Sequence, residues 1–149
     1  MADDFASLTP TIRVECFLLC DAAQEVGGKL FILGGGWDGL VASSFPWTHP
    51  HFAIAMRLAV PWVEANRPRQ FRIHLRDEDG NEVLRDPMEG GFNVGRPPNV
   101  EPGDDLPVLL AISVSGVTYP RPGDYTYHLL IDGEERARAR VRARLARRT

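Results

Sequence analysis

The sequence predicts an all-β protein, built as a two-sheet antiparallel immunoglobulin-like sandwich of seven or eight strands. Apolar and polar residues alternate with a period of two along most of the 149 residues. Turn residues, chiefly glycine, proline and aspartate, separate the alternating segments. No capped segment of ten or more residues shows the apolar stripe of period 3.6 that an amphipathic helix requires. Together these observations favour a sandwich over any helical class.

The first predicted strand is apolar on both faces. One face carries every second residue from 12 to 20, and the other carries Phe17 and Leu19. We therefore expect this strand to be covered on both sides or paired with another chain. A second strand, residues 29–34, follows the Gly27-Gly28 turn and ends in three glycines, which suggest a bulge or a close backbone approach.

The middle of the chain predicts further half-buried strands. Residues 52–60, 71–76 and 108–114 each present one inward apolar row, and residues 82–84 form a short return after a turn. Residues 85–105 form the longest irregular stretch, which predicts either a functional or a mobile loop.

The sequence of the final hairpin predicts which residues of its two strands lie opposite each other. Tyr125 and Tyr127 should face the core together with the alanines of residues 137–143, which leaves the intervening arginines outside. A two-residue Asp132-Gly133 turn would instead pair Tyr127 with an arginine. We therefore predict a three-residue turn with a bulge at Gly133, which pairs Tyr127 with Ala137.

Size and charge indicate one soluble domain. The chain length suits a single sandwich domain over residues 11–146, preceded by a flexible segment at residues 1–10. No apolar run is long enough to cross a membrane, and the acidic start, Met1-Ala2-Asp3-Asp4-Phe5, is unlike a secretory signal, so we expect a cytoplasmic protein. Residues 1–135 hold 10 basic and 20 acidic side chains, net −10, whereas residues 136–149 hold seven arginines and no acid.

Several strand-end motifs resemble those of a known family. They are Leu19-Cys20-Asp21-Ala22, the run from Gly28-Lys29-Leu30 to Gly34-Gly35, Pro122-Gly123-Asp124-Tyr125 and Asp132-Gly133-Glu134. This pattern resembles a family of small bacterial β-sandwich proteins classed as a domain of unknown function. The resemblance implies a sandwich and a bacterial origin, and it supplies no activity and no catalytic residues. The chain departs from the pattern at Gly36-Trp37-Asp38.

The sequence carries no recognisable catalytic or cofactor motif. It has no GxSxG elbow, no cysteine-protease signature and no complete phosphate-binding loop, so we predict no enzyme activity and no cofactor. Cys16 and Cys20 lie about 13 Å apart on an extended strand, too far for a disulfide, and are interpreted as reduced buried thiols.

Two histidines raise the question of a metal site. His49 and His51 flank Pro50, and a third ligand from Asp38 or His74 would complete a zinc or iron site. We favour ordinary loop histidines and predict no bound metal.

Ten residues are candidates for binding a partner. Alternation along the last strand should place five arginines in a row about 27 Å long, joined by Arg72, His74 and Arg76, unless acidic strands neutralise it. Trp37, Trp47 and Trp62 are expected to plug the sandwich ends, although exposed tryptophans beside Asp38 would suit a carbohydrate. The binding candidates are Arg136, Arg138, Arg140, Arg142, Arg144, Trp37, Asp38, Trp47, His49 and His51.

These features predict a non-enzymatic module for protein–protein interaction or self-assembly, through the first strand or the arginine-bearing edge. A homo-oligomer or another protein partner is expected, and no membrane contact. Two alternatives stay open. The arginine row could bind nucleic acid or another polyanion, which is not favoured because no aromatic residues alternate with the arginines. The sandwich could also bind a small molecule or carbohydrate.

Overall fold

The structure is a computed structural model that describes residues 11–147, and this part of the chain is all-β apart from one short 3-10 turn, as predicted. The predicted flexible segment, residues 1–10, lies outside the described residues. No helix in the described part is long and apolar enough to cross a membrane. In order, the elements are β1 (Arg13–Val26), β2 (Lys29–Gly35), β3 (Gly39–Ala42), β4 (Trp47–His49), β5 (Phe52–Pro61), η1 (Trp62–Glu64), β6 (Arg69–Asp77), β7 (Met88–Phe92), β8 (Asp105–Val114), β9 (Val117–Tyr119), β10 (Gly123–Ile131) and β11 (Glu134–Leu145).

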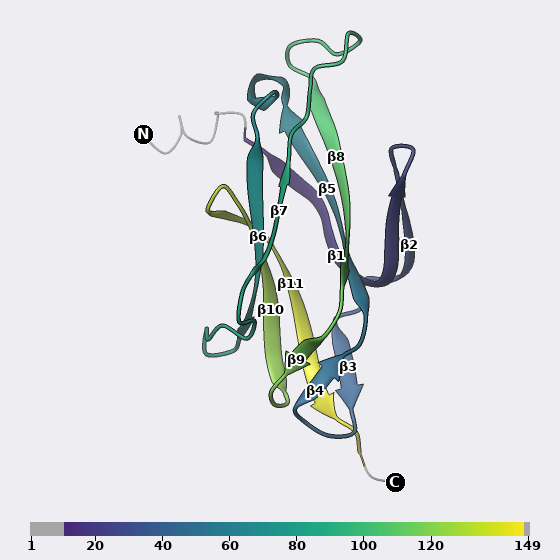
Figure 1. The fold of residues 1–149 in the computed structure, drawn as a ribbon, viewed down its shortest axis with the longest axis vertical. Helices are drawn as coiled ribbons and strands as arrows, with labels where there is room; N and C mark the ends of the chain where they lie inside the picture. The colour runs from purple at the N-terminus through teal and green to yellow at the C-terminus, as the bar shows by residue number, and fades with distance from the viewer. Residues whose placement is uncertain (1–10, 148–149) are drawn as a thin grey trace.

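The strands form two larger sheets and one small one (Figure 1). The first sheet has the order β2-β1-β5-β8, the second β3-β11-β10-β6-β7, and β4 pairs with β9. All pairings are antiparallel except that of β3 with β11. The described residues thus form eleven strands, not seven or eight, because β3, β4, β7 and β9 are too short to show alternation. β7 lies inside the stretch 85–105 that was predicted to be irregular, and residues 82–84 supply only a single bridge from Glu82 to Arg76.

The main core lies between the two larger sheets. Every second residue of β5 from Phe52 to Val60 is fully buried there, as the alternation predicted. From the opposite sheet, β6 contributes Ile73 and Leu75, and β10 contributes Tyr127 and Leu129. Each such side chain stabilises the fold by about 1.5–3 kcal/mol when it leaves water, so this shared core holds the sheets together.

β1 contacts two cores, because a bulge changes which side of the strand each residue faces. The register with β5 shifts between Val14 and Cys16. Val14 therefore joins Phe17 and Leu19 in the main core, whereas Leu18 and Cys20 pack on the other side of the sheet. The predicted single row from residue 12 to residue 20 is wrong for this reason, while the expectation that both faces are covered is confirmed.

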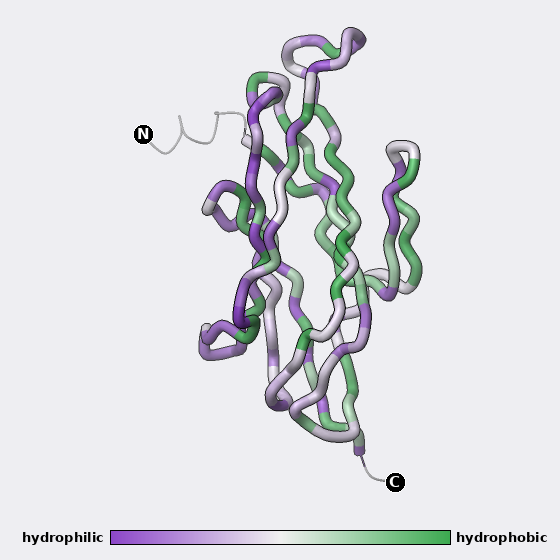
Figure 2. The backbone as a smooth tube through the Cα atoms, viewed as in Figure 1, coloured by the Kyte–Doolittle hydropathy of each residue, from purple (hydrophilic) through white to green (hydrophobic). Residues whose placement is uncertain are grey.

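Beyond Cys20, β1 leaves the sheet and pairs with β2 to form a two-stranded arm, residues 20–35. Cys20 is the last residue paired with β5, through Ala53, and the first paired with β2, through Gly35. In Figure 1 the arm stands to the right of the sheet as a separate hairpin. Figure 2 shows that much of its β2 strand is hydrophobic.

The glycines at the base of the arm mark a close approach, one of the two predicted alternatives. Gly34 has a φ of +57°, and a Cβ atom there would overlap the carboxyl group of Asp21. A Cβ atom at Gly35 would lie 2.8 Å from Cγ2 of Ile32. Larger residues would therefore clash with side chains of the arm itself and distort its base.

The final hairpin places its alanines on the predicted face, but its turn and the position of its bulge differ from the prediction. Asp132 and Gly133 form a two-residue turn with φ values of +50° and +85°, which suits the twist of a hairpin. The register then shifts between Leu129 and Leu130, so Tyr127 pairs with Ala139. The predicted three-residue turn, and its pairing with Ala137, are wrong because the extra residue enters the strand, at Arg136, and not the turn.

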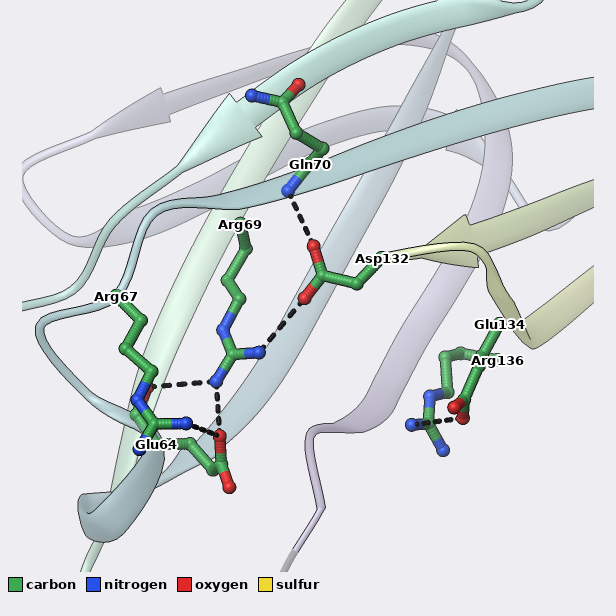
Figure 3. Close-up of polar contacts among 7 residues, drawn as sticks. All are labelled: Glu64, Arg67, Arg69, Gln70, Asp132, Glu134 and Arg136. Atoms are coloured by element: carbon green, nitrogen blue, oxygen red, sulfur yellow. Dashed lines mark hydrogen bonds and ion pairs between the residues drawn. The ribbon is translucent and has the colours of Figure 1, made fainter.

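An ion-pair cluster fixes this turn to the start of β6 (Figure 3). One carboxyl oxygen of Asp132 accepts from the Arg69 guanidinium at 3.0 Å, and the other accepts from the backbone N–H of Gln70 at 3.1 Å. Arg69, whose side chain is only 16% exposed, also pairs with Glu64. Burial alone would raise the pKa of Asp132, but the hydrogen bonds from Gln70 and Arg69 outweigh it and lower that pKa.

We predict that Arg69→Met destabilises the protein by about 1–3 kcal/mol, because it leaves Asp132 without its cation and Glu64 with only its longer pair to Arg67 at 3.4 Å. Urea unfolding followed by tryptophan fluorescence measures the change. The control is Arg72→Met, whose pair with Glu89 is largely exposed and should contribute less than about 1 kcal/mol. Equal losses in the two variants would contradict a structural role for the Arg69 cluster.

Candidate functional site

The outer face of the β3-β11-β10-β6-β7 sheet gathers most of the predicted arginine row. Arg138, Arg140 and Arg142 of β11 pair with residues of β10, and two of those β10 residues, Thr126 and His128, also pair with Arg76 and His74 of β6. Paired residues in an antiparallel sheet share a face. We call this the basic face, which consists of Arg72, His74, Arg76, His128, Arg138, Arg140, Arg142 and Arg144.

Acidic side chains neutralise much of the basic face. Glu82 pairs with Arg76 at 2.7 Å and with His74 at 3.2 Å. Glu135 pairs with Arg138 at 2.8 Å and also with His128. Hydrogen bonds from Arg138 and His128 lower the pKa of Glu135.

Two further acids complete this pattern on the same face. Asp124 accepts from Arg142 at 2.8 Å, and Glu89 pairs with Arg72 at 3.1 Å. Acidic side chains therefore neutralise Arg72, Arg76, Arg138 and Arg142, which disfavours polyanion binding by these four residues.

Arg140 and Arg144 differ from their neighbours, because neither has an ion-pair partner within residues 11–147. Both line an open groove of about 720 Å³ that crosses β3, β11 and the start of β10. Asp38 lines the same groove, so this candidate lies beside the arginines and not beside the histidines. The groove is lined by Asp38, Gly39, Leu40, Val41, Glu78, Asp124, Tyr125, Thr126, Arg140, Val141, Arg142 and Arg144.

Arg136 does not belong to the predicted row. The β11 bulge lies at this residue, since Leu129 pairs with Ala137 and Leu130 pairs with Glu135. Arg136 consequently pairs with Glu134 at 2.9 Å, in the region of Asp132 (Figure 3). The row on the basic face therefore contains four of the five predicted arginines of the last strand.

Trp37, Trp47 and His49 form an aromatic cluster at one end of the core. The His49 ring lies 5.5 Å from that of Trp37, 5.0 Å from that of Trp47 and 4.8 Å from that of Phe52, measured between centroids. Both tryptophans are half-buried and pack against the main core. This is the plugging arrangement that was preferred over an exposed carbohydrate platform.

Trp62 and the histidines take no part in a metal-binding group within the described residues. Trp62 packs under the Arg96 guanidinium, 3.7 Å from the ring centroid. His51 is exposed. Within residues 11–147, no three histidine, cysteine, aspartate or glutamate side chains are arranged to hold a metal ion. The cysteines are free, and burial raises the pKa of both Cys16 and Cys20.

The arm exposes large apolar side chains that the sequence analysis did not single out. Val26, Phe31 and Leu33 are 49%, 56% and 71% exposed and lie on the same face of the hairpin. The opposite face carries Ala23 and Leu30, which pack over β5. The signal was present in residues 30–33, where four consecutive large apolar residues leave neither face of a strand polar.

Comparison with known proteins places the chain in a family. Residues 15–144 match a family of unknown function, DUF6941. The chain belongs to this family. The expected resemblance to an uncharacterised family is thereby confirmed, and the DUF6941 match includes both the arm and the basic face.

Other comparisons add no function to the DUF6941 assignment. No curated protein matches the sequence. A solved structure with some similarity is the Pseudomonas fluorescens alkylpurine DNA glycosylase AlkC bound to DNA containing an abasic site analog. It has 11% sequence identity and a TM-score of 0.43, and the match covers 89% of this chain and 30% of that chain. A likeness at this level supports no inference about the present protein.

The aromatic cluster predicts a pH dependence of stability. Burial lowers the pKa of His49 from its ordinary value of 6.5, although nearby Asp21 opposes the shift. The unfolded chain then binds the proton more readily than the folded one. Stability from this group is complete above pH 6.5 and is lost as the pH falls from 6.5 through the lower folded-state pKa.

We therefore expect wild-type protein to lose stability between pH 7 and pH 5.5, measured by urea unfolding at each pH. His49→Phe should flatten that dependence, because the aromatic contacts remain and the titrating group is gone. His51→Gln, at the exposed histidine, should reduce the slope only slightly, because the charge of His51 is a smaller cause of the lowered pKa of His49 than burial is. A slope that survives His49→Phe would assign it to another residue.

Proposed function

We propose that this DUF6941 protein acts by binding protein through the apolar face of its arm, without catalysing a reaction. The observation that carries this proposal is the exposure of Val26, Phe31 and Leu33 on one face of a hairpin that projects from the sheet. Clustered apolar side chains of this kind mark interaction surfaces in folded proteins.

The form of the arm supports the same proposal. An isolated two-stranded hairpin is marginally stable in water. Here Ala23 and Leu30 on one face pack against the body of the protein, whereas Phe31 and Leu33 on the other face are largely exposed. A bound protein would complete the burial of the hairpin. The non-enzymatic part of the proposal rests on the sequence, which offers no catalytic motif.

A photo-reactive amino acid at Leu33 tests this function. We expect irradiation of the protein in its native cells to give covalent protein adducts at position 33, because this side chain is 71% exposed on the arm. The same group at Val63, which is 50% exposed on η1, is the control and should give none. If position 33 yields no protein adduct, the arm is not a protein contact and the proposal fails.

A second candidate function is binding of a polyanion at the groove. The observation that favours it is the absence of an ion-pair partner for Arg140 and Arg144 within residues 11–147, while most other arginines of the basic face are paired. Unpaired guanidinium groups can contact phosphate or sulfate groups without first breaking an internal ion pair.

We expect the double variant Arg140→Ala and Arg144→Ala to elute from heparin at lower salt and to lose about one unit of salt-dependence slope for each arginine. The control is Arg13→Ala with Arg57→Ala, which changes the net charge equally at arginines paired with Asp105 and Glu15. Identical elution of the two double variants would exclude a specific role for the groove.

We also propose that the two larger sheets form an immunoglobulin-like sandwich. The Tyr125 hydroxyl donates to the backbone carbonyl of Arg121 at 2.5 Å, four residues upstream near the start of the penultimate strand. This contact is similar to the tyrosine corner of such sandwiches, which supports the proposal.

A further inference from the structure

We infer that the protein bound by the arm is a second copy of this chain, joined to the first by antiparallel pairing of the two β2 strands about a two-fold axis. The inference rests on the proposed function, and it adds the identity of the partner and the register of the contact.

β2 is an unprotected edge strand. In the order β2-β1-β5-β8, its far side has no paired strand in the described chain. Natural sheets protect their edges with charges, prolines, bulges or very short strands. After Lys29, the remaining residues of β2, 30–35, include no charge and no proline.

The other edges of the two larger sheets carry such protection. β8 contains Pro107, which cannot donate a backbone hydrogen bond to a neighbouring strand. Its residues 108–114 carry no charge or proline, but residues 108–112 are partly buried, whereas every residue of β2 except Leu30 is exposed. β3 has only four residues, and β7 has five, one of which is Glu89. The contrast makes β2 the edge to which another strand can be added.

Symmetry selects the register of the added strand. A two-fold axis perpendicular to the sheet keeps each face of β2 on the same side, so each residue must pair with one of the same parity. An axis at Ile32, the midpoint of β2, brings all seven residues from 29 to 35 opposite the partner strand, with the extended backbone interrupted at Gly34 by its positive φ. An axis at Phe31 would pair only residues 29 to 33.

This register also groups apolar side chains and separates the charges. Phe31 of each copy lies opposite Leu33 of the other, so four large apolar side chains become neighbours on the exposed face. Lys29, the one charged residue of β2, lies opposite Gly35. With the axis at Phe31, Lys29 would instead face Leu33.

The same features favour a second copy over a different protein. The exposed face of the arm offers no cluster of one charge that would select an acidic or basic partner, since Lys29 is its one ionised residue. Its own edge, in contrast, is matched in length and apolar pattern by the two-fold operation, which also keeps the two Lys29 side chains at opposite ends of the contact. Pairing would make the β2-β1-β5-β8 sheet continuous across both copies.

Light scattering after size exclusion tests the oligomer. We expect wild-type protein to show twice its monomer mass of 16.6 kDa at concentrations of tens of micromolar and above. Leu33→Lys should halve that mass, because it places an ammonium group beside Phe31 of the partner. The matched control Val63→Lys should stay dimeric, and both variants should keep the circular dichroism of the wild type, since both positions are largely exposed. A monomeric wild type, or loss of the dimer in both variants, overturns the inference.

Cysteine cross-linking tests the register. In a Cys16→Ser background, Ile32→Cys places two cysteines opposite each other at the axis, with Cα atoms about 4.5–5.5 Å apart, close enough for a disulfide. We expect mild oxidation to convert at least ten times more Ile32→Cys than Phe31→Cys protein into a covalent dimer. The reverse preference would move the axis to Phe31 and overturn this register.

The two proposals fail on different observations. If photo-adducts at Leu33 contain only another protein and the purified chain is a monomer, the arm binds protein and the second-copy inference is wrong. If position 33 gives no adduct and the chain is a monomer, both are wrong.

Discussion

Ala53 and Ala55 are fully buried on the outer face of β5, although the main core lies against the opposite face of that strand. A strand buried on both faces needs a cover on its second side. Here the cover is Leu18 of β1 together with Ala23 and Leu30 of the arm, which pack on the two alanines. This contact fixes which face of the arm turns inward, and so it also fixes which face exposes Phe31 and Leu33. The proposed interaction surface is therefore a consequence of how β5 is covered.

The two candidate surfaces of the protein differ in whether their side chains and backbone groups already have partners within the described chain. On the basic face, acidic residues of β7, β10, β11 and the segment after β6 form ion pairs with most of the arginines. The net positive charge there is small, and among the arginines of the basic face only Arg140 and Arg144 have no ion-pair partner within residues 11–147. The arm, in contrast, leaves apolar area and one edge of backbone groups without a partner in the described chain. The addition of a strand would both bury this apolar area and pair the free backbone groups of the edge.

The sequence was most informative where burial is one-sided and the partner strand is regular. The inward row of β5 and the common face of the core tyrosines and the β11 alanines followed from alternation alone, whereas the exact pairing of Tyr127 did not. It was least informative where one residue shifts the register. The bulge after Val14 moved Leu18 and Cys20 to the second core, and the bulge at Arg136 removed that arginine from the predicted row. Both shifts depend on the strand opposite, which is remote in sequence.

The sequence by itself determined the all-β class, the apolar faces of the long strands and the presence of alternating arginines on the last strand. These are local properties, because side chains in any strand point alternately to its two faces. Only the tertiary structure decided that β1 exchanges β5 for β2 at Cys20, that acids from other strands neutralise the arginines, and that Val26, Phe31 and Leu33 remain exposed. Those outcomes depend on which segments meet in space, and a pattern of period two is the same whether its apolar face meets a core, another copy or water.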